Sequence, residues 1–133
     1  MKNIKAANAN IALVGVDAKA SIWSRLRQEA AISAAEEPVL ASLLHATILT
    51  HENLSDALAY HLAQKLGDAD MNALQIREVC ASVFAKSPDI MEKIEADMEA
   101  VMARDPACSS FLQPFLYFKG FAALQAYRVA HNL

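Results

Sequence analysis

Apolar residues recur every three or four positions along most of the chain, which is the spacing that places them on one face of an α-helix. The first stripe consists of Ile22, Leu26 and Ala30. Asp17 precedes this stripe and can cap the N-terminus of a helix there. Pro38 marks a new start, because the missing N–H of proline costs nothing in the first turn of a helix. These signals predict one helix after Asp17 and a second helix from Pro38 to about Thr50.

Three further stripes follow, and each begins soon after a residue that can cap a helix. Asn53 precedes the first of them, and Gly67 ends it. Asp70 precedes the second stripe, and the pair Ser87-Pro88 precedes the third. The apolar positions expected in the core are Leu54, Leu58, Leu62, Leu66, Leu74, Val79, Val83, Phe84, Ile90, Ile94, Met98 and either Val101 or Met102. We therefore expect three more helices in these segments.

The C-terminal segment from about Leu112 carries apolar residues in helical register almost to the end of the chain. Its positions in helical register are Phe115, Phe118 or Lys119, Ala122, Ala126 and Val129. Gly120 lies inside this segment, and its lack of a side chain would let a neighbouring helix come close. The complete pattern predicts an all-α fold, a compact bundle of five or six helices whose last helix is long and apolar.

The composition agrees with one helical domain. The 133 residues are 55% hydrophobic and include only 3 glycines and 4 prolines, so residues that favour turns are scarce. A chain of this length is long enough to bury a core but too short for two ordinary domains. We assign residues 17–133 to the helical domain and residues 1–16 to a flexible N-terminal tail.

Charge and cysteine usage narrow the range of partners and compartments. The formal net charge of −3 leaves no basic surplus to neutralise the phosphates of a nucleic acid. No stretch approaches the roughly 20 apolar residues that a membrane span needs. Cys80 and Cys108 lack the spacing of a zinc site and are too few for a disulfide scaffold. We expect a cytoplasmic protein that binds neither nucleic acid nor membrane.

Side-chain spacing alone assigns no catalytic, cofactor-binding or metal-binding residue. The four histidines form no HxxxH pair that would place two imidazoles on one helical face. His51 lies beside Glu52 and is a conceivable general base, although an exposed histidine at a helix end is the commoner case. Cys80 and Cys108 are interpreted as small thiols, buried or half-buried, rather than as nucleophiles. No glycine-rich motif is present to hold a phosphate group.

The turn Arg104-Asp105-Pro106-Ala107 leaves two interpretations open. In the structural interpretation, Asp105 caps the next helix and Pro106 occupies its first turn. In the functional interpretation, the Asp105 carboxylate lies at a helix junction and binds the ammonium group of a small substrate. Spacing by itself does not choose between them.

Four segments together resemble a known family. They are EPVLASLLHATILTHENLSDALAYHLAQKL (37–66), IREV (76–79), ARDPA (103–107) and FLYFKGFAALQAYRVAH (115–131). In this order they resemble the N-terminal helical domain of bacterial and plant serine O-acetyltransferases. The similarity extends from about Ile22 to the end of the chain and leaves residues 1–16 outside it.

The resemblance implies a function that spacing does not show. Enzymes of this family transfer an acetyl group from the co-substrate acetyl-CoA to the hydroxyl of L-serine, in the biosynthesis of cysteine. Their catalytic histidine and acetyl-CoA site lie on a following β-helix of hexapeptide repeats. The helical domain is implied to mediate a homo-oligomer, a trimer or a dimer of trimers. The aspartate of the RDPA turn, here Asp105, is implied to contact the bound serine.

This sequence departs from the family because no hexapeptide repeat is found in its 133 residues. We therefore expect an oligomerising, substrate-lining domain that is inactive alone and binds no cofactor itself. Contact with O-acetylserine sulfhydrylase is not expected, since the family uses its C-terminal tail for that association. The alternative is a free-standing helical interaction module that assembles with, or regulates, the full-length enzyme.

Overall fold

A computed structural model describes residues 21–117 and 119–133, and within these ranges the chain is all-α, as predicted. No strand occurs among the described residues. The elements are α3 (Ile22–Glu36), α4 (Pro38–Leu44), the π-helix η1 (His45–Leu49), α5 (Leu54–Leu66), α6 (Ala73–Lys86), α7 (Pro88–Arg104), α8 (Leu112–Tyr117) and α9 (Lys119–His131). No described helix is both long and apolar enough to cross a membrane.

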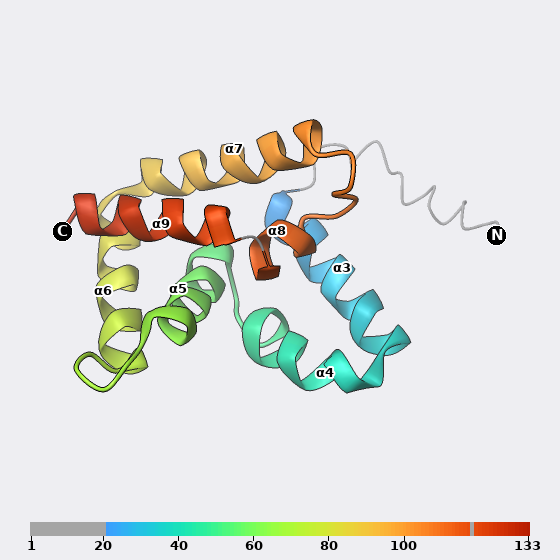
Figure 1. Cartoon of the computed structure of the whole chain (residues 1–133), viewed down its shortest axis with the longest axis horizontal. Coiled ribbons are helices and arrows are strands. Elements are labelled where there is room, and N and C mark those ends of the chain that lie inside the picture. The colour runs from blue at the N-terminus through green and yellow to red at the C-terminus, as the bar shows by residue number, and fades with distance from the viewer. Residues whose placement is uncertain (1–20, 118) are drawn as a thin grey trace.

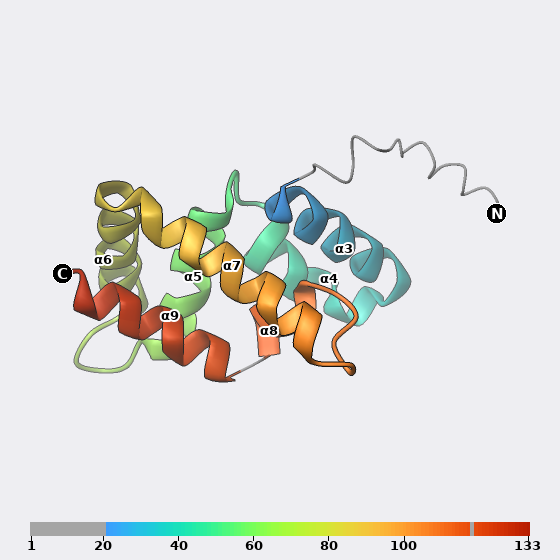
Figure 2. The same cartoon turned by 90° about the horizontal axis from the view of Figure 1, so that it is seen from above.

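The helices form two groups that contact each other through η1 and α5 and through the C-terminal part of the chain. Helix α3 packs against α4 and η1, while α5 and α6 form a helical hairpin. Helix α7 contacts α6, α8 and α9, and α8 also contacts α3 (Figures 1 and 2). The last three helices therefore close the core between the two groups.

Local capping residues explain where most of these helices begin. The Asn53 side chain accepts a hydrogen bond from the Asp56 N–H at 2.9 Å, which confirms Asn53 as the N-cap of α5. Pro38 and Pro88 lie in the first turns of α4 and α7, also as predicted. Helix α6 begins after Asp70, as predicted, and its N-cap is Asn72, which forms a complete capping box with Gln75.

The N-terminus of α3 is capped by Ser21, whose hydroxyl accepts a hydrogen bond from the Ser24 N–H at 3.0 Å. The expected cap, Asp17, and the expected tail of residues 1–16 lie outside the described residues.

Most of the predicted core positions are buried. Those exposed by no more than 1% are Leu26, Ala30, Leu58, Leu62, Ile90, Ile94, Met98 and Phe115. Leu66 and Leu74 are exceptions, with 48% and 64% exposed. Leu66 is the last residue of α5 and Leu74 lies in the first turn of α6, so both flank the connection between these helices. The prediction that these two leucines are core residues is therefore wrong.

The π-helix η1 is a feature that apolar spacing did not predict. The Thr50 N–H donates to the carbonyl of His45 at 3.1 Å, five residues earlier, as in a π-turn. Carbonyls at the end of this helix accept hydrogen bonds from the Arg27 guanidinium, which donates to Leu49 at 3.1 Å and to His51 at 2.7 Å. Arg27 lies on α3, so a residue distant in sequence stabilises this local geometry.

The single long apolar helix expected in the C-terminal segment is not confirmed. The described helices of this segment are α8 with 6 residues and α9 with 13 residues, and residue 118 between them lies outside the described residues. The buried stripe of α9 is Phe121, Gln125 and Val129, whereas Ala122 and Ala126 lie only partly buried at its edge. A Cβ atom placed on Gly120 would meet nothing within 4 Å, so the expectation of a closely approaching helix there is wrong.

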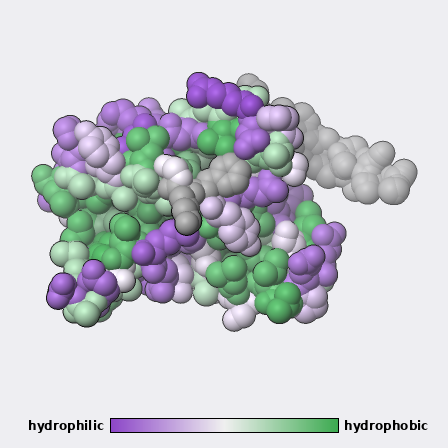
Figure 3. Space-filling view, in the orientation of Figure 1, coloured by the Kyte–Doolittle hydropathy of each residue, from purple (hydrophilic) through white to green (hydrophobic). Residues whose placement is uncertain are grey.

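Some apolar side chains remain on the surface at the α3–α4 end of the molecule. We call Ile32, Val39 and Leu43 the tip patch, and they are 50%, 87% and 45% exposed respectively. Figure 3 shows apolar surface over α4 at the lower right of this face. Single exposed apolar residues are common, and these three lie on the adjacent helices α3 and α4.

Candidate functional site

Asp105 ends α7 and closes a turn. Its backbone N–H donates to the carbonyl of Val101 at 3.0 Å, which is the last hydrogen bond of the helix. Its Oδ1 atom accepts a hydrogen bond from the Ala107 N–H at 2.9 Å. Such a bond to the backbone two residues ahead is typical of aspartate in turns.

The structural interpretation of Asp105 as a helix cap is wrong in its details. No helix begins at Pro106, and the next helix, α8, starts only at Leu112. The local sequence favours a cap and a turn equally, because aspartate followed by proline suits both. The side chain of Asp105 is half-buried, and the described residues provide no hydrogen bond to its second oxygen, Oδ2. This oxygen is available to a ligand.

A groove of about 560 Å³ lies between α7 and α9, with Asp105 at one end. Its lining residues are Asp97, Ala100, Val101, Arg104, Asp105, Pro106, Gly120, Phe121 and Leu124. The open space beside the Gly120 Cα atom belongs to this groove. The structure therefore places Asp105 at a concave surface, although the sequence indicated only a turn.

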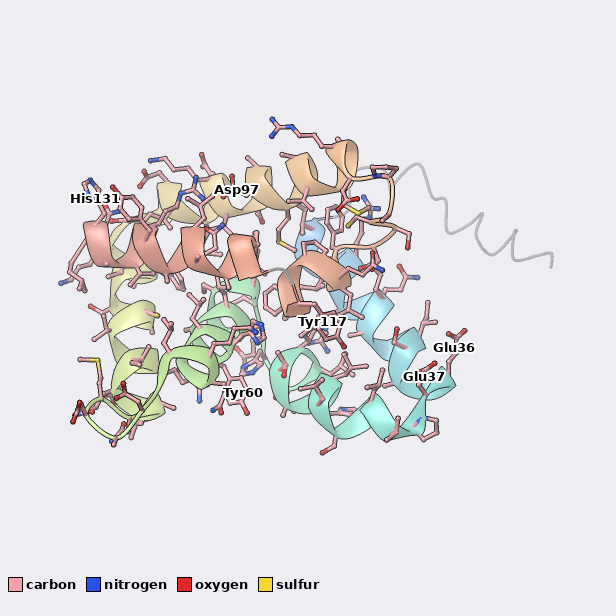
Figure 4. The ribbon with its side chains drawn as sticks, viewed as in Figure 1. Glu36, Glu37, Tyr60, Asp97, Tyr117 and His131 are labelled. Atoms are coloured by element: carbon pink, nitrogen blue, oxygen red, sulfur yellow. The ribbon has the colours of Figure 1, made fainter. Side chains whose placement is uncertain are left out.

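A cluster of polar side chains joins the two walls of the groove. Gln125 on α9 is fully buried and donates from Nε2 to Asp97 Oδ2 on α7 at 2.9 Å. Arg128 also donates to Asp97 Oδ2, and it donates to Gln125 Oε1 at 3.0 Å. Figure 4 shows Asp97 between the α7 and α9 ribbons. Asp97 is paired with a guanidinium, whereas Asp105 forms no ion pair within the described part of the chain.

Apolar spacing alone did not predict this cluster, although the sequence contains a signal for it. Gln125 lies four residues after Phe121 and four before Val129, so it occupies the apolar face of the helix. A buried amide needs partners, and Arg128 one turn later supplies one of them.

His51 is not the exposed helix-end histidine that we expected. Its side chain is only 9% exposed, and its Nε2 donates to the carbonyl of Ala46 at 3.0 Å. Its ring also packs against the Tyr60 ring, with centroids 5.2 Å apart. The imidazole therefore stabilises the end of η1 and lies outside the groove that Asp105 lines.

His61 is a second buried histidine, and its spacing did not distinguish it from the other histidines. Its ring stacks on Phe115 of α8, with centroids 5.2 Å apart and planes inclined by 18°. Its Nε2 atom is buried without a hydrogen-bond partner among the described residues. Burial, together with the nearby charge of Lys65, lowers the pKa of His61 to about 4. The imidazole is therefore neutral at pH 7.

The other candidate residues have simple surroundings. Cys80 and Cys108 are buried free thiols, as predicted, and burial raises the pKa of Cys80. His131 is exposed and stacks on Tyr127 near the end of α9 (Figure 4). The described residues contain no group of three or more side chains that could ligate a metal ion. The groove can thus bind a cationic group through Asp105, but it assembles no nucleophile and base.

Comparison with known proteins identifies the family. The family model "Serine acetyltransferase, N-terminal" matches residues 22–126. The chain belongs to the serine acetyltransferase family, as its N-terminal domain. The resemblance stated from the sequence is therefore confirmed.

Relatives of this serine acetyltransferase domain are bacterial and plant proteins. The serine acetyltransferase of Escherichia coli K12 is 47% identical over 112 residues, which are 84% of this chain and 41% of that protein. The crystal structure of Neisseria gonorrhoeae serine acetyltransferase in complex with serine has a TM-score of 0.83 at 45% identity. It covers 86% of this chain, which spans 47% of that chain.

A plant structure shows the same helical domain. Soybean serine acetyltransferase complexed with serine has a TM-score of 0.80 and 38% identity, over 83% of this chain and 45% of the soybean chain. This chain thus spans less than half the length of these relatives.

Proposed function

We propose that this domain lines the serine site of a serine acetyltransferase, an enzyme that acetylates the hydroxyl of L-serine with acetyl-CoA in cysteine biosynthesis. Membership of the family supports this proposal, and two of the related structures hold serine. The observation that carries it is the half-buried Asp105 carboxylate, whose Oδ2 is free at the end of the groove.

The chemistry of serine fits this carboxylate. At pH 7 the amino group of serine is an ammonium ion, which pairs with a carboxylate through charge-assisted hydrogen bonds. The bond from the Ala107 N–H fixes Oδ1, so the carboxylate presents Oδ2 in one orientation. Partial burial lowers the local dielectric constant and strengthens such a pair relative to one in open solvent. Asp105 therefore forms one side of the site, and the catalytic part of the enzyme provides the rest.

The role of Asp105 can be tested in a graft in which residues 22–126 replace the matching segment of the Escherichia coli relative. We expect Asp105→Asn to raise the KM for serine at least about tenfold, because a hydrogen bond to a charged group contributes about 1.5 to 3 kcal/mol. Asparagine retains an oxygen for the Ala107 N–H, so the turn persists while the charge is lost. Steady-state kinetics with varied serine measures the effect.

Asp89→Asn is the matched control for this experiment. Asp89 also lies on α7, but its side chain is 66% exposed and pairs only with Lys93 at 3.6 Å. This control should leave the KM for serine unchanged. If Asp105→Asn behaves like Asp89→Asn, the carboxylate serves only the turn and the proposed substrate role is wrong.

We also propose that the domain assembles a homo-oligomer, a trimer or a dimer of trimers, in the cytoplasm. The tip patch supports assembly, because burying exposed apolar side chains against a second copy contributes about 25 cal/mol per Å². The two free thiols agree with a reducing compartment.

The purified chain is expected to have a mass in solution well above the 14.4 kDa of one copy. Sedimentation equilibrium measures this mass directly. Val39→Lys tests whether the tip patch is the interface, since Val39 is 87% exposed and its replacement does not disturb the core. A lower mass for this variant would place the interface at the tip patch, whereas a monomeric wild-type chain would contradict the assembly proposal.

The 133 residues by themselves are expected not to transfer acetyl groups. His51 is packed against Tyr60 and His61 is buried under Phe115, and neither imidazole lines the groove of Asp105, where a base would have to reach the serine hydroxyl. Supplying acetyl-CoA and L-serine should release no thiol above the background of hydrolysis. Measurable turnover by the purified chain would contradict this proposal.

A further inference from the structure

The turn that carries Asp105 is attached to α3 as well as to α7. It spans residues 105–111 and ends where α8 begins. Glu29 on α3 accepts a hydrogen bond at Oε1 from the Leu112 N–H at 3.1 Å, across 83 positions of sequence. The Arg25 guanidinium, one turn earlier on α3, lies 4.6 Å from the centre of the Phe111 ring. Two adjacent side chains of α3 thus hold the far end of the turn.

The bond from Leu112 to Glu29 replaces a local helix cap. The first N–H groups of a helix have no partner within the helix, and a nearby side chain normally satisfies one of them. Here the carboxylate comes from another helix, so it fixes both the start of α8 and the path of the chain that leads to it. Phe111 is only 2% exposed, which anchors the same point in the core.

The remaining contacts of the turn are short-range. The Cys108 Sγ atom lies 3.8 Å from the Met102 Sδ atom and 3.3 Å from the carbonyl oxygen of Ser110. The Ser109 N–H donates to Gln113 Oε1 at 2.9 Å. These contacts fold the turn upon itself and against α7. The attachment of the turn to α3 therefore depends on Glu29 and on the packing of Arg25 and Phe111.

We propose that Glu29 is a positioning residue, which fixes the 105–111 turn and thereby holds the Asp105 carboxylate at the end of the groove. The proposal rests on the serine role of Asp105 described above. Glu29 is distant from Asp105 in the sequence, and it acts on Asp105 through the backbone of the turn. Its loss shifts Asp105 without removing the carboxylate.

Three substitutions of Glu29 separate positioning from charge. Alanine removes the acceptor, and aspartate keeps the charge but shortens the reach to the Leu112 N–H. Glutamine keeps the length and an acceptor oxygen without the charge. In the graft with the Escherichia coli relative, Glu29→Ala and Glu29→Asp should each raise the KM for serine about fivefold. The reason is that a displaced Asp105 carboxylate loses part of its interaction with the substrate. The kcat should stay within about twofold, and Glu29→Gln should restore the KM to within about twofold of the parent graft.

Combining the variants tests whether Glu29 acts through Asp105. Glu29→Ala added to Asp105→Ala should raise the KM for serine no further than Asp105→Ala alone, because coupled residues are not additive. Full additivity, or a loss of kcat with an unchanged KM, would overturn the proposal. If Glu29→Ala prevents folding, the contrast between Glu29→Asp and Glu29→Gln gives the same test.

Hydrogen exchange on the complete 133-residue chain gives a readout that is independent of activity. Glu29→Ala should speed the exchange of the amides from Ala107 to Leu112, and Glu29→Gln should leave them protected. Unchanged exchange in Glu29→Ala would overturn the proposal while leaving the role of Asp105 intact. Conversely, an unchanged serine KM in Asp105→Asn would refute the proposed function even if Glu29 holds the turn.

Discussion

Replacing Asp97 with alanine is expected to lower the free energy of unfolding by about 2 to 4 kcal/mol, because it removes an acceptor shared by two side chains. Gln125 is fully buried and would lose its partner on α7, and Arg128 would lose its counter-charge. About a quarter of the Asp97 and Arg128 side chains is exposed, at 24% and 22%, so the cost lies below that of a completely buried pair. Urea unfolding followed by circular dichroism measures it.

Two comparisons make this result interpretable. Asp97→Asn retains an oxygen for the Gln125 amide but loses the charge, so its cost should lie between those of wild type and Asp97→Ala. Asp89→Ala removes another aspartate from α7, but its ion pair with Lys93 is exposed and should be worth less than about 1 kcal/mol. Equal costs for Asp97→Ala and Asp89→Ala would show that the cluster contributes nothing beyond a surface pair.

The helix starts at Pro38, Asn53 and Pro88 could be predicted from the sequence because their signals are local. A cap or a first-turn proline acts within three or four residues, so a short window contains the whole cause. The buried stripes of α5 and α7 were predictable for a similar reason, since an apolar face requires a partner wherever that partner comes from. The local sequence therefore determined most of the all-α architecture.

The features that could not be predicted depend on residues far apart in sequence. The π-helix η1 is stabilised by Arg27, and the start of α8 is fixed by Glu29, both on α3. Gln125 is polar, so a prediction of burial from apolar residues alone places it on the surface unless its partner Asp97 is known. The same limit applies to Asp105, whose identity suited a cap and a turn equally until the position of α8 was known.

Acidification is expected to destabilise the domain through His61, whose pKa is lowered from 6.5 to about 4 by burial and by Lys65. In the unfolded chain this imidazole gains a proton near pH 6.5, whereas in the folded domain it stays neutral until about pH 4. Between these values the unfolded state binds more protons, so stability falls as the pH falls. The loss of folding stability that is due to His61 is absent above pH 7 and grows to at most about 3 kcal/mol near pH 4.

His61→Phe isolates this contribution from that of the other titrating groups. Phenylalanine keeps the stacking on Phe115 and replaces the Nε2 atom, which has no partner among the described residues, by carbon. Near pH 7.5 the variant should be as stable as the wild type or slightly more stable, because no polar atom is left buried and unpaired. Toward pH 4.5 it should become more stable than the wild type by about 2 kcal/mol, because it has no imidazole to protonate on unfolding. Urea unfolding across this range measures both curves, and parallel curves would mean that protonated His61 is accommodated in the fold and that its burial does not control acid stability.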